Sequence, residues 1–94
     1  MAMRDSATTL RIRLVYLARL REAFDRAGEP YELSAEHCTV EALLASLRAR
    51  GGAFATELAD RRAVRVAVNH ALAKPGDEIR DGDEVALFPP VTGG

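Results

Sequence analysis

The chain has 94 residues, of which 48% are hydrophobic and 29% are charged. This size accommodates one domain with one modest core, and the composition is that of a globular chain and not a disordered one. Thirteen basic and fourteen acidic side chains leave a net charge of −1. This balance supplies no general attraction to nucleic acid or to an anionic membrane, so we expect neither as a partner.

The sequence contains no targeting or disulfide signal. No apolar run approaches the roughly 18 residues of a membrane span, and residues 1–8 (MAMRDSAT) lack the apolar core of a secretory signal. We interpret residues 1–8 as a disordered leader. The single cysteine, Cys38, has no partner for an internal disulfide, which favours a reducing cytoplasm. One cysteine and two histidines exclude a cysteine-rich zinc site, and no bound metal is expected.

Two strands and a short helix are predicted for the first third of the chain. Apolar and charged residues alternate from residue 10, which predicts a half-buried strand over 10–17 with apolar side chains on both faces near its end. Helical spacing of apolar residues predicts a short helix over 19–27, with Gly28 as its C-cap. Residues 29–30 (Glu-Pro) are expected to break the pattern, so the next strand is predicted to be brief, over 31–33.

The middle of the chain contains the strongest helix signal, over 40–50. Thr39 is suited to its N-cap, and a further short helix is predicted over 53–60. The main helix presents one apolar stripe, made of Val40, Leu43, Leu44 and Leu47.

Short strands separated by turns are predicted for the last third. Alternation over 64–68 indicates a third strand, and Asn69-His70 is a candidate turn that leads to Leu72 in a short extended piece. Residues 84–88 predict the last strand, after two glycine-containing turns.

This order of elements indicates an α+β fold. A helix with one apolar stripe covers one face of a mixed sheet. The prediction is a β-grasp roll over 9–89, with four to five strands and one main helix. The first and last strands are expected to be central neighbours, because they are the longest apolar ones.

Three apolar residues have no predicted cover. If alternate residues of the first strand face the helix, Leu17 faces away from it. Phe88 faces away when its neighbours in the last strand face in, and Leu72 lies just past a turn. Isolated apolar residues on a surface are common, but together these three are typical of a partner-binding patch.

The sequence ends in Phe88-Pro-Pro-Val-Thr-Gly-Gly94. Neither Pro89 nor Pro90 has an N–H to donate to a ladder, so both end the strand and favour an extended chain. Residues 90–94 are then expected to form a flexible tail that spans roughly 17 Å at ~3.3 Å per residue. Only glycine lets another protein close around the backbone up to the carboxylate. This pattern suits activation of the tail at the Gly94 carboxylate.

On these residues the chain resembles the small, sulfur-carrying subunit of molybdopterin synthase, a ubiquitin-like β-grasp family. The Pro-Pro-Val-Thr-Gly-Gly ending after Asp-Gly-Asp-Glu-Val is the specific part, whereas a terminal Gly-Gly alone is shared by several carriers. The matching segments are 12–18, 20–22, 39–43, 67–69, 81–86 and 88–94.

The resemblance implies a carrier and not an enzyme acting alone. An E1-like activating enzyme would adenylate Gly94 with ATP, and a sulfur donor would convert it to a thiocarboxylate. The tail would then enter the large synthase subunit, in a two-plus-two heterotetramer, and pass sulfur to cyclic pyranopterin monophosphate. No cofactor would be bound by this chain itself. The implied tail-insertion residues are Pro89, Pro90, Val91, Thr92 and Gly93, and the implied partner contacts are Leu17, Leu72 and Phe88.

Three alternatives stay open from the sequence. The chain is a carrier for another product (thiazole, cysteine or thiolated tRNA), a ubiquitin-like modifier that forms isopeptide bonds, or an interaction domain with an inert tail. Other chemistry is weakly indicated: Cys38, His37 and His70 lack paired catalytic groups, and the acidic residues over 77–84 lack the spacing of an EF-hand loop.

Overall fold

The computed structural model describes residues 9–59 and 64–90; the predictions for residues 1–8 and for the tail beyond Pro90 lie outside them. Within these ranges no helix is long and apolar enough to span a membrane. The described elements are β1 (Thr9–Tyr16), α1 (Arg19–Phe24), β2 (Gly28–Ser34), a 3₁₀ helix (Ala35–His37), α2 (Val40–Arg48), α3 (Gly52–Glu57), β3 (Arg65–Val68), β4 (Ala71–Leu72) and β5 (Glu84–Phe88).

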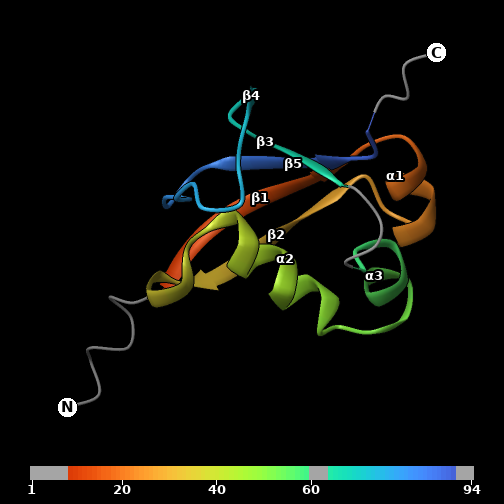
Figure 1. Ribbon diagram of the computed structural model, residues 1–94, viewed down its shortest axis with the longest axis horizontal. Helices are drawn as coiled ribbons and strands as arrows, with labels where there is room; N and C mark the ends of the chain where they lie inside the picture. The colour runs from red at the N-terminus through yellow and green to blue at the C-terminus, as the bar shows by residue number, and fades with distance from the viewer. Residues whose placement is uncertain (1–8, 60–63, 91–94) are drawn as a thin grey trace.

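These strands form one mixed sheet in the order β2-β1-β5-β3-β4 (Figure 1). The first and last strands, β1 and β5, are adjacent and parallel, and the other pairings are antiparallel. The predicted central position of these two strands is therefore confirmed. With α2 packed across one face of the sheet, the arrangement is the predicted β-grasp fold of the α+β class.

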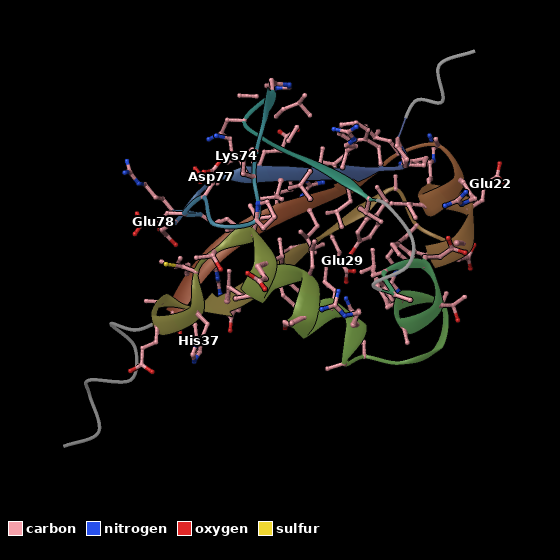
Figure 2. The ribbon with its side chains drawn as sticks, viewed as in Figure 1. Glu22, Glu29, His37, Lys74, Asp77 and Glu78 are labelled. Carbon is pink, nitrogen blue, oxygen red and sulfur yellow. The ribbon has the colours of Figure 1, made fainter. Side chains whose placement is uncertain are left out.

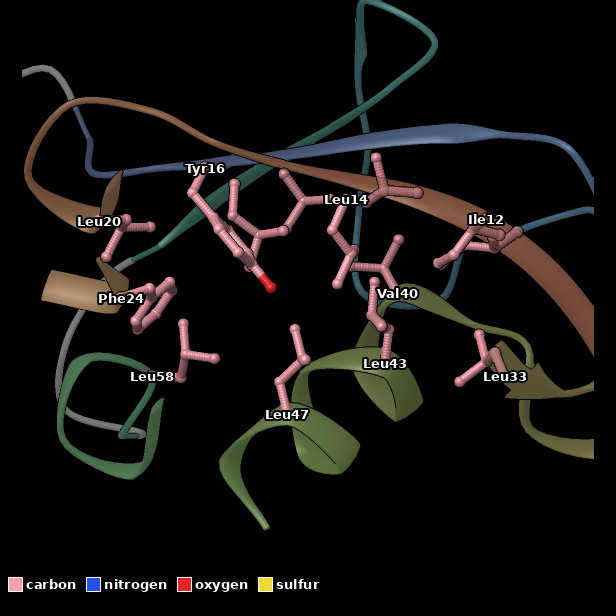
Figure 3. Packing of buried hydrophobic residues seen from close by; sticks show 14 residues of the cluster. Ile12, Leu14, Tyr16, Leu20, Phe24, Leu33, Val40, Leu43, Leu47 and Leu58 are labelled. Carbon is pink, nitrogen blue, oxygen red and sulfur yellow. The ribbon is translucent and has the colours of Figure 1, made fainter. Parts of the chain in front are cut away.

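The core lies between the sheet and the helices (Figure 3). Three of the four stripe residues on α2 are buried, and Leu44 packs against the core half-buried. The Thr39 hydroxyl accepts a hydrogen bond from the Ala42 N–H at 3.1 Å, which confirms the predicted N-cap. The buried side chains are Ile12, Leu14, Tyr16, Leu20, Phe24, Leu33, Val40, Leu43, Leu47, Leu58, Val66, Ile79, Val85 and Leu87.

The segment between β1 and α2 differs from the prediction. Helix α1 ends at Phe24 and not at residue 27, because Asp25 adopts a left-handed conformation (φ 58°) and forms the C-cap in place of Gly28. Gly28 instead begins β2, where a Cβ atom would lie 2.3 Å from the Leu14 carbonyl oxygen. Pro30 lies inside β2 and does not break it, because β2 is the edge strand and tolerates a residue without an N–H. Helix α2 ends at Arg48, two residues earlier than predicted.

A polar cluster fastens β2 to the end of α2. The Tyr16 hydroxyl donates to Glu29, which also accepts from Arg26 at 2.8 Å and from Arg50 at 2.9 and 3.3 Å. The Arg50 guanidinium lies 4.4 Å from the centre of the Phe54 ring on α3. Burial and the hydrogen bond to Glu29 raise the pKa of the Tyr16 hydroxyl. Burial also raises the pKa of Glu29, but the hydrogen bonds from Arg50 and Tyr16 outweigh it and leave that pKa below its ordinary value.

Candidate docking face and C-terminal strand

The sheet has a second face, turned away from α2, which we call the outer face. Strand pairing aligns one apolar row across all five strands, because residues directly opposite each other share a face. A second row continues the β1–β5 register past the end of β1. The first row is Gly28, Val15, Ala86, Ala67 and Leu72, and the second is Leu17, Phe88 and Arg65.

The three residues predicted to be uncovered all lie on this face. Leu72 is 69% exposed and Leu17 is 43% exposed, the two large hydrophobic residues that are exposed in the described part of the chain. Phe88 is half-buried. Leu17 and Phe88 are neighbours, whereas Leu72 lies across the face from them, with Ala67 and Ala86 between. The structure thus places them on one surface, and their contact with a partner stays a prediction.

A strained turn holds Leu17 at its place. The Leu17 N–H donates to the Leu87 carbonyl at 3.1 Å, and its own carbonyl accepts from the Leu20 N–H at 3.1 Å. This second bond closes a turn in which Ala18 has φ 53° and ψ −131°, a conformation that favours glycine. The turn follows β1 directly, so Leu17 extends the outer face instead of entering α1.

Leu72 is positioned by a clamp on the β3–β4 turn. Asn69 and His70 both have positive φ (51° and 74°), as a two-residue hairpin turn requires. The Asn69 side chain donates to Asp83 at 2.9 Å and accepts from the Glu84 N–H at 3.0 Å. The predicted turn is confirmed, and it is fixed to the start of β5.

β5 directs the chain toward the tail. It runs parallel to β1 and ends at Phe88, beside Leu17. Pro89 and Pro90 follow and are half-buried. The predicted site residues Val91, Thr92, Gly93 and Gly94 lie outside the described residues. The last described residues therefore leave the sheet at the Leu17 end of the outer face.

The acidic residues over 77–84 have structural roles in turns. Asp81 accepts from the Arg11 N–H at 2.7 Å, Asp83 from the Arg80 N–H at 2.8 Å, and Asp77 from the Lys74 N–H at 2.9 Å. Figure 2 shows Asp77 and Glu78 at the end of the molecule opposite α1. Within the described residues, no three His, Cys, Asp or Glu side chains lie close enough to hold a metal ion.

Sequence reasoning missed that small residues lie side by side at the centre of the outer face. Ala67 and Ala86 belong to the apolar row, but only the β3–β5 register shows them side by side. It also missed the clamp by Asn69, which the sequence marks only as a turn residue. The alternation of each strand was a usable signal; the alignment between strands was not available from the sequence.

The mixed sheet covered by α2 places this chain among the ubiquitin-like β-grasp proteins, with an apolar row on the face that the described helices leave uncovered. The profile of the ThiS family matches residues 14–94, and the chain belongs to that family. It is 39% identical over 83 residues to the molybdopterin synthase sulfur carrier subunit of Escherichia coli K12, covering 88% of this chain and 99% of that one.

Two solved structures show the same fold with related sequences. A Pyrococcus furiosus protein described as a candidate subunit 1 of molybdopterin converting factor is 30% identical, with a TM-score of 0.73 over 87% of this chain and 99% of its own. The small archaeal modifier protein 1 (SAMP1) of Haloferax volcanii is 27% identical, with a TM-score of 0.71 over 89% of this chain and 99% of its own.

Proposed function

We propose that this chain is a sulfur carrier in molybdenum cofactor biosynthesis, with the Gly94 carboxylate as its reactive group. The 39% identity to the Escherichia coli carrier subunit, over nearly the whole of that relative, is the observation that supports it most. The family match extends through Gly94. The free cysteine suits a carrier that works in the reducing cytoplasm.

The proposed cycle begins on a separate E1-like activating enzyme, which binds the ATP. The Gly94 carboxylate attacks the α-phosphorus, so that pyrophosphate leaves and an acyl-adenylate forms. Hydrosulfide delivered by the donor then attacks the acyl carbon, AMP leaves, and the product is a thiocarboxylate. This chain supplies the acyl group and the docking surface, and it needs no cofactor of its own.

Sulfur transfer takes place in the large subunit of molybdopterin synthase. The outer face docks on that subunit through Leu17, Leu72 and Phe88, burying apolar surface that is otherwise in water. Pro89 and Pro90 keep the following chain extended, and the missing Cβ at Gly93 and Gly94 lets the tail enter a narrow channel. There the thiocarboxylate sulfur bonds to cyclic pyranopterin monophosphate, and water then cleaves the bond between the sulfur and the acyl carbon, which restores the Gly94 carboxylate.

Intact mass spectrometry tests the carrier chemistry. The chain is incubated with an adenylating enzyme, ATP and a sulfur donor, and we expect one oxygen to be replaced by one sulfur. A variant without Gly94 is the control, because oxidation of Met1, Met3 or Cys38 adds nearly the same mass. Persistent absence of the Gly94-dependent shift, with an enzyme that loads another carrier, would refute the proposal.

Protein modification is the second candidate, favoured by the likeness to SAMP1. In that case the activated Gly94 acylates a lysine of a target protein. Denaturing gels of cell extract with ATP distinguish the two functions: a modifier gives a covalent ladder that disappears with the Gly94 deletion, whereas a sulfur carrier gives none.

A further inference from the structure

The edge strand β2 has outward backbone groups on the side away from β1. The bond from the Tyr16 N–H to the Ala27 carbonyl, at 2.8 Å, sets the alternation of the β1–β2 ladder. Accordingly Tyr31 and Leu33 direct their backbone groups to β1, while those of Pro30, Glu32 and Ser34 point outward. Pro30 has no N–H to offer, so the edge that pairs with no other strand among residues 9–59 and 64–90, called the free edge below, comprises the Pro30 carbonyl, the Glu32 N–H and carbonyl, and the Ser34 N–H.

A groove runs between this free edge and α2, which lie near each other in Figure 1. Its volume is about 430 Å³. The small side chains on α2 leave room beside the strand, and the hydrogen bond between Tyr31 and Ser46 fixes the spacing of β2 and α2 at one end. Glu32, Leu33 and Ser34 line the β2 side, and Ala42, Ala45 and Ser46 line the α2 side, with His37 contributed by the 3₁₀ helix.

The charges at the edge indicate what an added strand would contain. Glu32 lies on the outer face, where its side chain is 61% exposed and its carboxylate pairs with Arg11 at 3.5 Å. A residue directly opposite Glu32 on an added antiparallel strand lies on the same face. A cation at that position would pair with the Glu32 carboxylate from the side opposite Arg11. Its two neighbours point to the other face, into the groove beside Leu33, Ala42 and Ala45, where aliphatic side chains fit.

From this geometry we propose that the free edge of β2 accepts an extended segment of a partner protein with an aliphatic–basic–aliphatic sequence. Backbone hydrogen bonds to Glu32 and Ser34 supply affinity, and the groove and the Glu32 carboxylate supply specificity. The backbone edge and the groove lie beyond β1 from β5, away from Leu17, Leu72 and the tail, and only the Glu32 carboxylate of this site lies on the outer face. The carrier therefore offers two surfaces, and the proposal does not depend on the chemistry of Gly94.

Nuclear magnetic resonance of the ¹⁵N-labelled full chain tests this site. The probe is a capped peptide with a Ser-Val-Lys-Val-Ser core, and the control is the same peptide with Glu in place of Lys. We expect shifts of the Glu32, Ser34 and Ala45 amides with the lysine peptide, and weaker binding of the glutamate peptide. No shift at millimolar lysine peptide, or shifts centred on Leu72, would overturn the proposal.

Variants separate the hydrogen bonds, the charge and the groove. Glu32→Pro removes the outward N–H while leaving the β1–β2 bonds, and we expect it to abolish peptide binding. Glu32→Gln should weaken binding about two- to fivefold. Ala45→Met fills the groove and should also abolish binding, whereas Ala49→Met, at the exposed residue that follows α2, should leave it unchanged. Equal peptide binding by the wild-type and Ala45→Met chains would show that the groove is not part of the binding site.

The oligomeric state of the chain without peptide tests whether the edge binds another protein or a second copy of this chain. Sedimentation without peptide should show a monomer, since the groove is proposed for another protein. Concentration-dependent dimers whose formation shifts the Glu32 amide would assign the edge to a second copy of this chain and refute the proposed partner.

Discussion

The two faces of the sheet are built from the same strands, yet they differ in what covers them. The inner face lies against α2 and buries Leu14, Val85 and Leu87 completely. The outer face has apolar residues in register too, but none of the described helices packs on it, and Leu72 is 69% exposed. An apolar side chain therefore stabilises the fold on one face and is available for binding on the other. Alternation along β1 and β5 separates the two roles by a single residue.

Replacing leucine by alanine on each face tests whether the two faces differ in their contribution to stability. Leu14 is fully buried at the centre of the core, so Leu14→Ala should lower the free energy of unfolding by about 2–5 kcal/mol. Leu72→Ala removes the same atoms from the outer face and should change stability by less than ~0.5 kcal/mol. Urea unfolding of both variants measures the difference. Similar losses for the two would mean that the outer face is covered in solution.

The inner face also contains a charged group, so the contribution of a charge to stability can be compared between the two faces. Glu29 lies opposite Leu14 and accepts hydrogen bonds from Tyr16, Arg26 and Arg50. Glu29→Gln keeps the size of the side chain but removes its charge, and should cost about 1–2 kcal/mol. Glu32→Gln is the matched control on the outer face: its ion pair with Arg11 is well exposed, so the loss should stay below ~0.5 kcal/mol.

The contribution of Glu29 has a defined pH dependence. Its pKa is lower in the folded chain than in the unfolded one, so the stabilisation is fully present above the unfolded value of about 4.3 and is lost as the pH falls through the folded value. The stability difference between wild type and Glu29→Gln should therefore shrink at about pH 3 relative to pH 7. If the stability difference between the two chains grew on acidification, the charge of Glu29 would not be what stabilises this cluster.

How far the sequence predicted these features depends on whether each is local. The α2 stripe, the Thr39 cap and the alternation of β1 and β5 are set within a few residues, and all were predicted. The early end of α1 was not predicted, because it depends on the left-handed backbone of Asp25. The position of Pro30 within β2 was not predicted either, because it depends on β2 being an edge strand. The apolar row through Ala67 and Ala86 arises from pairing between distant strands, and the groove beside β2 arises from the packing of α2 next to that strand. No local pattern shows these features.

The turn that links β1 to α1 contains a strained backbone conformation, which lowers the free energy of unfolding. Ala18 has φ 53° and ψ −131°, which costs a non-glycine residue of order 1–3 kcal/mol. Ala18→Gly should raise the free energy of unfolding by about 1 kcal/mol, after the entropy cost of glycine. Ala23→Gly, the same change inside α1, should lower it by a similar amount. Thermal unfolding compares them, and a loss at both positions would show that Ala18 is not strained.

Leu72→Ala should have the smallest effect on the free energy of unfolding, but it should weaken binding to a partner measurably. Because its side chain is mostly in water, Leu72→Ala leaves the folded chain almost unchanged. If the outer face docks on the large synthase subunit, the same variant should weaken that complex about tenfold, which corresponds to ~1.4 kcal/mol of lost apolar contact. Titration calorimetry with the purified large subunit measures it, and Ala49→Met, at the exposed residue that follows α2 on the other side of the sheet, serves as the control that leaves this surface intact. Equal affinity of wild type and Leu72→Ala would place the docking surface elsewhere, whereas a selective loss would show that the residues the core does not need are the ones the partner recognises.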